Sequence, residues 1–291
     1  MVEKRRSELV LGPWFLSRPY RTDHPTDKVV ASQEDQWLVG NPPGEAINDA
    51  TTDLRRFGYP PGAVSMTCRD KQNWLRMWRN DQIDFHQRSV NPLLVRFWGS
   101  LAPNRPSRIF VPLCGKSLDL LWLAEQGHEV VGVELSPVAV KAFFDENGLV
   151  PRVCRRKNYR VWEYGRLKIL CGDFFSLEQM DLGPIDVVYD RAALTALPEQ
   201  VRKRYVAHMR VIVPVDCRIF LLTIEDGCDE SEIPLLSKAY EAVDDEIKTL
   251  YAPYFEIQIA HTEAALESDP ANPSSPAIAV SHKVYRLRPR T

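Results

Sequence analysis

The sequence after residue 107 alternates short apolar runs with amphipathic stretches, and this alternation constrains the fold more than any other feature. The apolar runs predict strands at Arg108–Pro112, Glu129–Glu134, Leu167–Cys171, Ile185–Asp190 and Arg218–Ile224. The intervening stretches predict helices at Ser117–Gln126, Pro137–Asn147, Pro198–Arg210 and Ile233–Tyr251. Apolar strands separated by helices form parallel sheets that are covered on both faces. The sequence therefore predicts an α/β fold built on a mostly parallel sheet.

The two ends of the chain differ from this pattern. Phe255–Thr262 and Ala279–Leu287 are two further predicted strands, and the Pro/Ser-rich loop between them favours an antiparallel hairpin. Residues 1–65 are rich in Pro, Gly, Asp and Arg and have no sustained period, so we expect a largely irregular N-terminal extension. Residues 66–291 then form the folded domain. A product that starts at Met66 is a further hypothesis.

Charge and cysteine content narrow the functional class. The formal net charge of -2 and a pI near 6.3 argue against nucleic-acid and anionic-membrane partners, which favour a basic surface. No apolar run approaches the roughly 18 residues that cross a bilayer, and the N-terminus lacks the pattern of a signal peptide. The six cysteines are scattered, which favours reduced thiols over zinc ligands or disulfides. We expect a cytoplasmic protein without a metal.

The stretch from Ile109 to Ser136 carries the first chemical information. A predicted strand enters a turn at Leu113–Lys116, a helix follows, and the next strand ends at Glu134. In a βαβ unit this arrangement places the turn and the carboxylate at one crevice, where the carboxylate can bind ribose hydroxyls. The turn has one glycine, Gly115, and lacks the glycine pattern that cradles phosphates, which disfavours a nicotinamide dehydrogenase. S-adenosylmethionine fits these features, although strand–turn–helix–strand–Glu also occurs in many other α/β proteins.

Seven short sequence motifs narrow this prediction to one protein family. They are W-x-x-x-W (Trp74, Trp78), I-x-F-H-Q (Ile83–Gln87), N-P-L-L (Asn91–Leu94), V-P-L-C-G-K-S (Val111–Ser117), G-H-x-V-V-G-V-E-x-S (Gly127–Ser136), C-G-D-F-F (Cys171–Phe175) and D-R-A-A-L-x-A-L-P (Asp190–Pro198). In order and spacing the chain resembles the thiopurine S-methyltransferase family, especially its bacterial-type members. The resemblance covers roughly Asp70 to Leu287 and leaves out the N-terminal extension.

The resemblance implies a Rossmann-like class I methyltransferase with a seven-stranded sheet, S-adenosyl-L-methionine as cofactor and a monomeric state. The family's cofactor contacts fall on Trp74, Trp78, Leu113, Glu134, Asp173, Phe174 and Arg191. Phe85 would wall the acceptor pocket, and Arg191 is also the candidate for orienting the substrate. The resemblance assigns no general base. It implies transfer of a methyl group to a small thiol.

Several alternatives remain at this point. Trp74 and Trp78 could pack in the core, Glu134 could be a solvated strand end, and Arg191 could form a surface ion pair with Asp190. His86 has the chemistry of a base but is more often structural as a lone histidine.

Cys114 has no visible histidine partner, so packing is the simpler role. Leu266–Ser275 lacks the basic residues that mammalian members carry near the substrate. This difference makes a thiopurine acceptor less secure than methyl transfer itself. Bacterial-type relatives are associated with methylation of selenium and tellurium compounds, so the resemblance also implies this alternative activity. A catalytically inactive, cofactor-binding interaction protein is another alternative.

Overall fold

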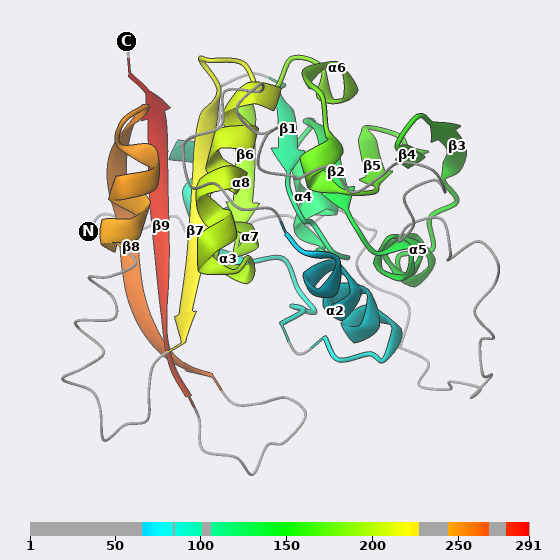
Figure 1. Ribbon diagram of the computed structural model, residues 1–291, viewed down its shortest axis with the longest axis horizontal. Coiled ribbons are helices and arrows are strands. Elements are labelled where there is room, and N and C mark those ends of the chain that lie inside the picture. Colours follow the sequence, from blue (N-terminus) through cyan, green and yellow to red (C-terminus); the bar gives the residue numbers. More distant parts are fainter. Residues whose placement is uncertain (1–65, 84, 101–105, 227–243, 268–277, 291) are drawn as a thin grey trace, which may run out of the picture. The chain divides into compact units, whose positions relative to one another are not determined.

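The computed structural model describes residues 66–83, 85–100, 106–226, 244–267 and 278–290, which form one sheet with helices on both faces (Figure 1). The strands are β1 (Arg108–Val111), β2 (Glu129–Glu134), β3 (Arg152–Arg156), β4 (Tyr159–Tyr164), β5 (Leu167–Cys171), β6 (Val187–Arg191), β7 (Arg218–Asp226), β8 (Phe255–Glu267) and β9 (Ile278–Pro289). The sheet has nine strands in the order β3-β4-β5-β2-β1-β6-β7-β9-β8. The central strands β5, β2, β1, β6 and β7 are parallel. This arrangement confirms the predicted α/β fold.

The helices alternate with the strands as expected. They are α2 (Cys68–Arg79), α3 (Pro92–Phe97), η3 (Trp98–Ser100), α4 (Asp119–Glu125), α5 (Pro137–Glu146), η4 (Phe174–Ser176), α6 (Gln179–Leu182), α7 (Ala193–Ala196), α8 (Glu199–Ile212) and a helix over residues 244–251. The remainder of the predicted helix at Ile233–Tyr251 and the predicted extension at residues 1–65 lie outside the described residues. So does most of the loop at Leu266–Ser275. Within the described ranges, no helix has the length and apolarity needed to span a membrane.

The predicted count of seven strands was wrong by two. Seven strands take the expected positions, including the antiparallel pair β8 and β9 at the C-terminal end. The additional strands β3 and β4 form a hairpin that pairs antiparallel with β5 at the edge of the sheet. Four of the five residues of β3 are exposed, and three of them are arginines. A strand at the sheet edge that buries almost nothing has no apolar run, so sequence periodicity cannot reveal it.

The parallel strands are buried on both faces, and alternate residues enter two different cores. On β1, Phe110 packs into a cluster with residues of α8 such as Tyr205 and Met209. Its neighbour Ile109 packs into the opposite cluster with residues of α4 and α5 such as Leu120. Because both faces are covered, the carboxyl edge of the sheet is where polar side chains from several strands meet. In Figure 1 this edge is at the bottom, next to α2.

Candidate functional site

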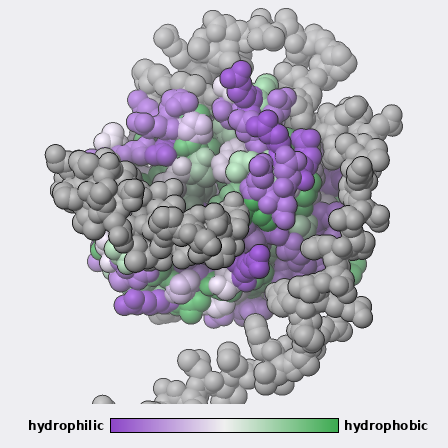
Figure 2. All heavy atoms as spheres, turned by 90° about the horizontal axis from the view of Figure 1, so that it is seen from below, coloured by the Kyte–Doolittle hydropathy of each residue, from purple (hydrophilic) through white to green (hydrophobic). Residues whose placement is uncertain are grey.

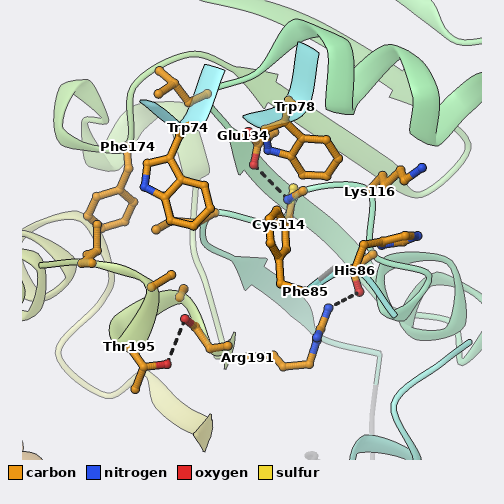
Figure 3. A pocket seen from close by; sticks show the side chains of 18 of the residues that line it. Trp74, Trp78, Phe85, His86, Cys114, Lys116, Glu134, Phe174, Arg191 and Thr195 are labelled. Atoms are coloured by element: carbon orange, nitrogen blue, oxygen red, sulfur yellow. Dashed lines mark hydrogen bonds between the residues drawn. The ribbon is translucent and has the colours of Figure 1, made fainter. Parts of the chain in front are cut away.

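A cavity of about 610 Å³ lies at the carboxyl edge of the sheet, between the strand ends and α2 (Figure 3). Its volume is within the range of sites for small molecules and cofactors. Apolar residues are visible between polar ones in the middle of the face seen from below (Figure 2). All eight predicted site residues line the cavity: Trp74, Trp78, Phe85, Leu113, Glu134, Asp173, Phe174 and Arg191. The fold thus brings residues that are more than 100 positions apart in the sequence to one site.

Glu134 ends β2 inside the cavity and is held at both carboxylate oxygens. The backbone N–H of Gly115 donates to Oε2 at 2.9 Å, and the N–H of Ser136 donates to Oε1 at 2.7 Å. Burial raises the pKa of Glu134 to about 6, while the backbone N–H groups oppose that shift. Because each carboxylate oxygen has a further lone pair, it can still accept a hydrogen bond from a ligand. The geometry excludes a solvated strand end, since this side chain is 6% exposed.

The turn after β1 has the backbone that a close approach requires. Leu113 and Gly115 both have positive φ angles, 46° and 53°. A Cβ on Gly115 would meet the Trp78 ring at 3.1 Å, so glycine allows α2 to lie directly against the turn. Left-handed backbone at a non-glycine residue such as Leu113 is uncommon and tends to occur at functional sites. Ala192, just after β6 in the same cavity, is a second case with a φ of 58°.

Three aromatic side chains line the cavity on the α2 side. The ring of Phe85 is close to perpendicular to that of Trp74, with centroids 5.7 Å apart, and to that of Trp78, with centroids 5.6 Å apart. Trp78 is largely buried, whereas Phe85 is 46% exposed. α2 begins with a capping box between Thr67 and Asp70, which fixes where the helix starts. Trp74 and Trp78 both line the cavity, so the two side chains do not only pack in the core.

Asp173 and Phe174 line the cavity but also have structural contacts that the sequence did not reveal. The Asp173 carboxylate forms an ion pair with Lys71 of α2 at 2.6 Å, and it accepts a hydrogen bond from the N–H of Phe175 at 3.1 Å. Phe174 is 2% exposed and packs on the ring of Tyr205. Most of the Phe174 ring is thus part of the core beneath the cavity.

Arg191 is paired with a different carboxylate from the one considered above. Asp190 is buried and accepts hydrogen bonds from Tyr205 and the start of α7, so the surface ion pair with Arg191 does not form. Instead, Nε of Arg191 lies 3.0 Å from Oδ2 of Asp119. A terminal nitrogen of Arg191 also donates to Oγ of Ser117 at 3.2 Å. The guanidinium is therefore held at the cavity wall.

His86, Cys114 and Lys116 are further residues of the lining that carry titratable groups. Burial lowers the pKa of His86, and Lys116 and Arg191 add to that effect, so this histidine is neutral at pH 7. Burial raises the pKa of the Cys114 thiol, and Glu134 adds to the shift, which keeps the thiol protonated. A Cβ on Gly132 would lie 2.8 Å from the Cys114 sulfur, so Cys114 fills the space over β2. Packing is the role that this geometry favours.

Sequence reasoning missed three charged residues: Lys71 and Lys116, which line the cavity, and Asp119, which contacts Arg191 from outside it. Lys71 pairs with Asp173, Lys116 pairs with Glu146 at 2.7 Å, and Asp119 pairs with Arg191. Lys116 follows Gly115 in the turn, so its position in the sequence could have indicated that it lies at the cavity. Asp119 reads as an ordinary acidic residue in the first turn of a helix, where the helix dipole favours it.

Comparison with known structures supports the fold. An S-adenosylmethionine-dependent methyltransferase from Anabaena variabilis superposes with a TM-score of 0.51 and covers 79% of this chain and 99% of its own. At 15% identity this similarity concerns the fold alone. The shared architecture is the Rossmann-like α/β fold of that S-adenosylmethionine-dependent methyltransferase.

Comparison with sequences gives the family. The family model of thiopurine S-methyltransferase matches residues 69–290, so the chain belongs to this family. A thiopurine S-methyltransferase from Stutzerimonas stutzeri is 55% identical over 222 residues, which cover 76% of this chain and 92% of that protein. One from Nitrosospira multiformis is 38% identical over 221 residues, which cover 76% of this chain and 99% of that protein.

Proposed function

We propose that the protein transfers the methyl group of S-adenosylmethionine to a small, soft nucleophile, with a thiol as the acceptor. The observation that carries this proposal is the buried carboxylate of Glu134, held by the N–H groups of Gly115 and Ser136 in an aromatic-lined cavity. Membership of the thiopurine S-methyltransferase family supports the same activity.

The cavity suits this cofactor in shape and charge. We assign the ribose hydroxyls to Glu134 and the apolar cover of the adenosine to Leu113 and to the part of Phe174 that lines the cavity. Trp74 and Trp78 would face the sulfonium and its methionine portion, because aromatic faces attract a cation by ~0.5–2 kcal/mol. Asp173 would accept a hydrogen bond from the adenine amine through the oxygen sites that Lys71 and Phe175 leave available.

The acceptor would bind between Phe85 and Arg191. The cofactor supplies a methyl group on an already activated sulfonium, so the protein's task is to align the acceptor and exclude water, which can contribute ~7–11 kcal/mol. Aromatic thiols and thiopurines ionise readily, and the cationic Arg191 favours the thiolate. The neighbouring His86 is neutral at pH 7 and so has the form that can accept a proton. A thiolate acceptor has no proton to lose, however, and needs no base.

A radiolabelled-cofactor assay tests the activity directly. The panel contains aryl thiols, thiopurines, selenite and tellurite, and the control is the Glu134→Gln variant of the same chain. We expect label transfer to thiols that the variant loses at low cofactor concentration. Transfer only to selenite or tellurite would replace the thiol with the alternative acceptor class. No transfer to any acceptor, with S-adenosylhomocysteine still bound, would favour a catalytically inactive, cofactor-binding interaction protein.

We also infer a monomeric, cytoplasmic enzyme with a functional domain at residues 66–291 and an extension at residues 1–65. The scattered cysteines support the cytoplasmic location, membership of the family supports the monomeric state, and the family match begins at residue 69. Assaying the chain with and without residues 1–65 tests the division. Equal rates would support an autonomous domain, and a rate that rises on removal would mean that the extension inhibits. Light scattering of both forms measures the oligomeric state.

A further inference from the structure

We propose that Asp119 is a positioning residue for the transfer reaction: it fixes the guanidinium of Arg191 at the acceptor end of the cavity. The inference rests on the proposed function, in which Arg191 faces the acceptor. Asp119 does not line the cavity and would touch neither cofactor nor acceptor. It would act through Arg191 alone.

The Asp119 carboxylate is buried and fully engaged. The side chain is at the start of α4 and is 1% exposed. Its Oδ1 accepts a hydrogen bond from the N–H of Asn91 at 2.8 Å, and its Oδ2 accepts one from the hydroxyl of Tyr189 at 2.9 Å. The same Oδ2 lies 3.0 Å from Nε of Arg191. A buried carboxylate is costly unless it is paired and hydrogen-bonded, and here each requirement is met.

The chain tethers Arg191 at a second point close to the first. Oγ of Ser117 accepts a hydrogen bond from the terminal nitrogen of Arg191 and another from the N–H of Asp119, both at 3.2 Å. Ser117 and Asp119 are two residues apart at the beginning of α4, so one short segment holds two nitrogens of the guanidinium. Because the guanidinium is planar and rigid, two fixed nitrogens determine where its remaining N–H groups point. In Figure 3 the dashed line from the Arg191 side chain marks this hydrogen bond to the Ser117 hydroxyl.

The alternative is that Asp119 only joins parts of the fold. It connects the residue that caps α3, Asn91, with Tyr189 of β6, and these contacts contribute to stability whatever Arg191 does. A structural role and a positioning role predict different behaviour in the presence and absence of Arg191. If Asp119 acts through Arg191, its replacement has no effect on transfer once Arg191 is gone.

The experiment is a double-mutant cycle with Asp119→Asn and Arg191→Met in the full chain. Three quantities are measured for each variant: kcat/KM for an aryl thiol, the Kd of that thiol in the complex with S-adenosylhomocysteine, and the thermal midpoint of unfolding. Asp119→Asn preserves shape and one acceptor oxygen while removing the charge. Tyr189→Phe is the matched control, because it removes a different hydrogen bond to the same carboxylate and leaves Arg191 in place.

We expect Asp119→Asn to lower kcat/KM by about 10- to 100-fold, as small misplacements of a binding group do. In the Arg191→Met background the same substitution is expected to change kcat/KM by less than about twofold, since the effects of coupled residues do not add. Tyr189→Phe is expected to lower the thermal midpoint while kcat/KM stays within about threefold of the wild type, because Asn91 still anchors the carboxylate. If Asp119→Asn fails to fold, Ser117→Ala removes the other tether and is expected to be non-additive with Arg191→Met as well.

Additive effects in the cycle would overturn the proposal. So would equal losses of transfer in Asp119→Asn and Tyr189→Phe, which would mark Asp119 as structural. The Kd of the thiol separates this outcome from failure of the proposed function. A wild type that binds the aryl thiol but transfers no methyl group refutes the methyl transfer, and the cycle on Kd still tests Asp119. A wild type that does not bind the thiol overturns both.

Discussion

Replacing Glu134 with glutamine tests the assignment on which the proposed function depends. The carboxylate uses one acceptor site per oxygen on the N–H groups of Gly115 and Ser136, which leaves one per oxygen for the ribose hydroxyls. A hydrogen bond to a charged group contributes about 1.5–3 kcal/mol. Glutamine removes the charge from both ribose bonds and replaces one acceptor with a donor. The expected loss is about 3 kcal/mol, on the order of 100-fold in Kd.

Isothermal titration calorimetry with S-adenosylhomocysteine measures this loss. Glu129→Gln is the control, because Glu129 is at the exposed, opposite end of the same strand. Burial raises the pKa of Glu134 from 4.5 to about 6, so the folded protein binds more protons than the unfolded chain between these values. The ionised group thus destabilises the ligand-free fold above pH 6 by about 2 kcal/mol, and removing its charge should not by itself lower the thermal midpoint at pH 7. An affinity within twofold of the wild type, in a folded variant, would refute the ribose assignment.

Three further predictions follow from the same geometry. We assign the ribose hydroxyls to the ionised form of Glu134, and burial raises the pKa of this carboxyl to about 6. The Kd of S-adenosylhomocysteine should therefore rise as pH falls below 6, by up to about tenfold per pH unit, and Glu134→Gln should flatten this profile in calorimetry. Gly115→Ala should weaken the binding of S-adenosylhomocysteine and lower the thermal midpoint, because the residue has a φ of 53° and the new methyl group would meet Trp78 at 3.1 Å. The control Gly99→Ala should do neither, since a Cβ there has nothing within 4 Å. His86→Ala should keep appreciable turnover with an acidic aryl thiol in the label-transfer assay, and complete loss of turnover in a folded variant would identify His86 as the base.

The architecture was largely predictable because its signals are local. The apolar runs that became β1, β2, β5, β6 and β7 are buried on both faces, so each is visible without knowledge of its neighbours. The hairpin β3–β4 was missed for the opposite reason. Its exposed residues, such as Arg155 and Arg156, belong to a strand only because β5 offers a free edge for pairing. α3 was missed as well, since it is only six residues long.

The candidate site divides in the same way. Glu134 and Gly115 are 19 residues apart within one βαβ unit, and the direct contact between them confirms that the turn and the strand end meet at one crevice. The family motifs named the other seven predicted site residues, which all reach the same cavity. Their partners were a different matter. Arg191 has an acidic neighbour in sequence, Asp190, yet pairs with Asp119, which is 72 positions away.

By itself the sequence determined the layered α/β fold, the family and the set of side chains at the carboxyl edge of the sheet. Periodicity and short motifs depend on neighbours within a few residues, so the chain carries them directly. Only the tertiary structure decided which charges pair. Burial removes water as the alternative partner, and each buried ion then takes whichever opposite charge the fold brings within about 3 Å. Asp119 with Arg191 is a pair of this kind, whereas Lys71 and Asp173 form a partly exposed pair. Both pairs orient groups that we expect to hold cofactor and acceptor.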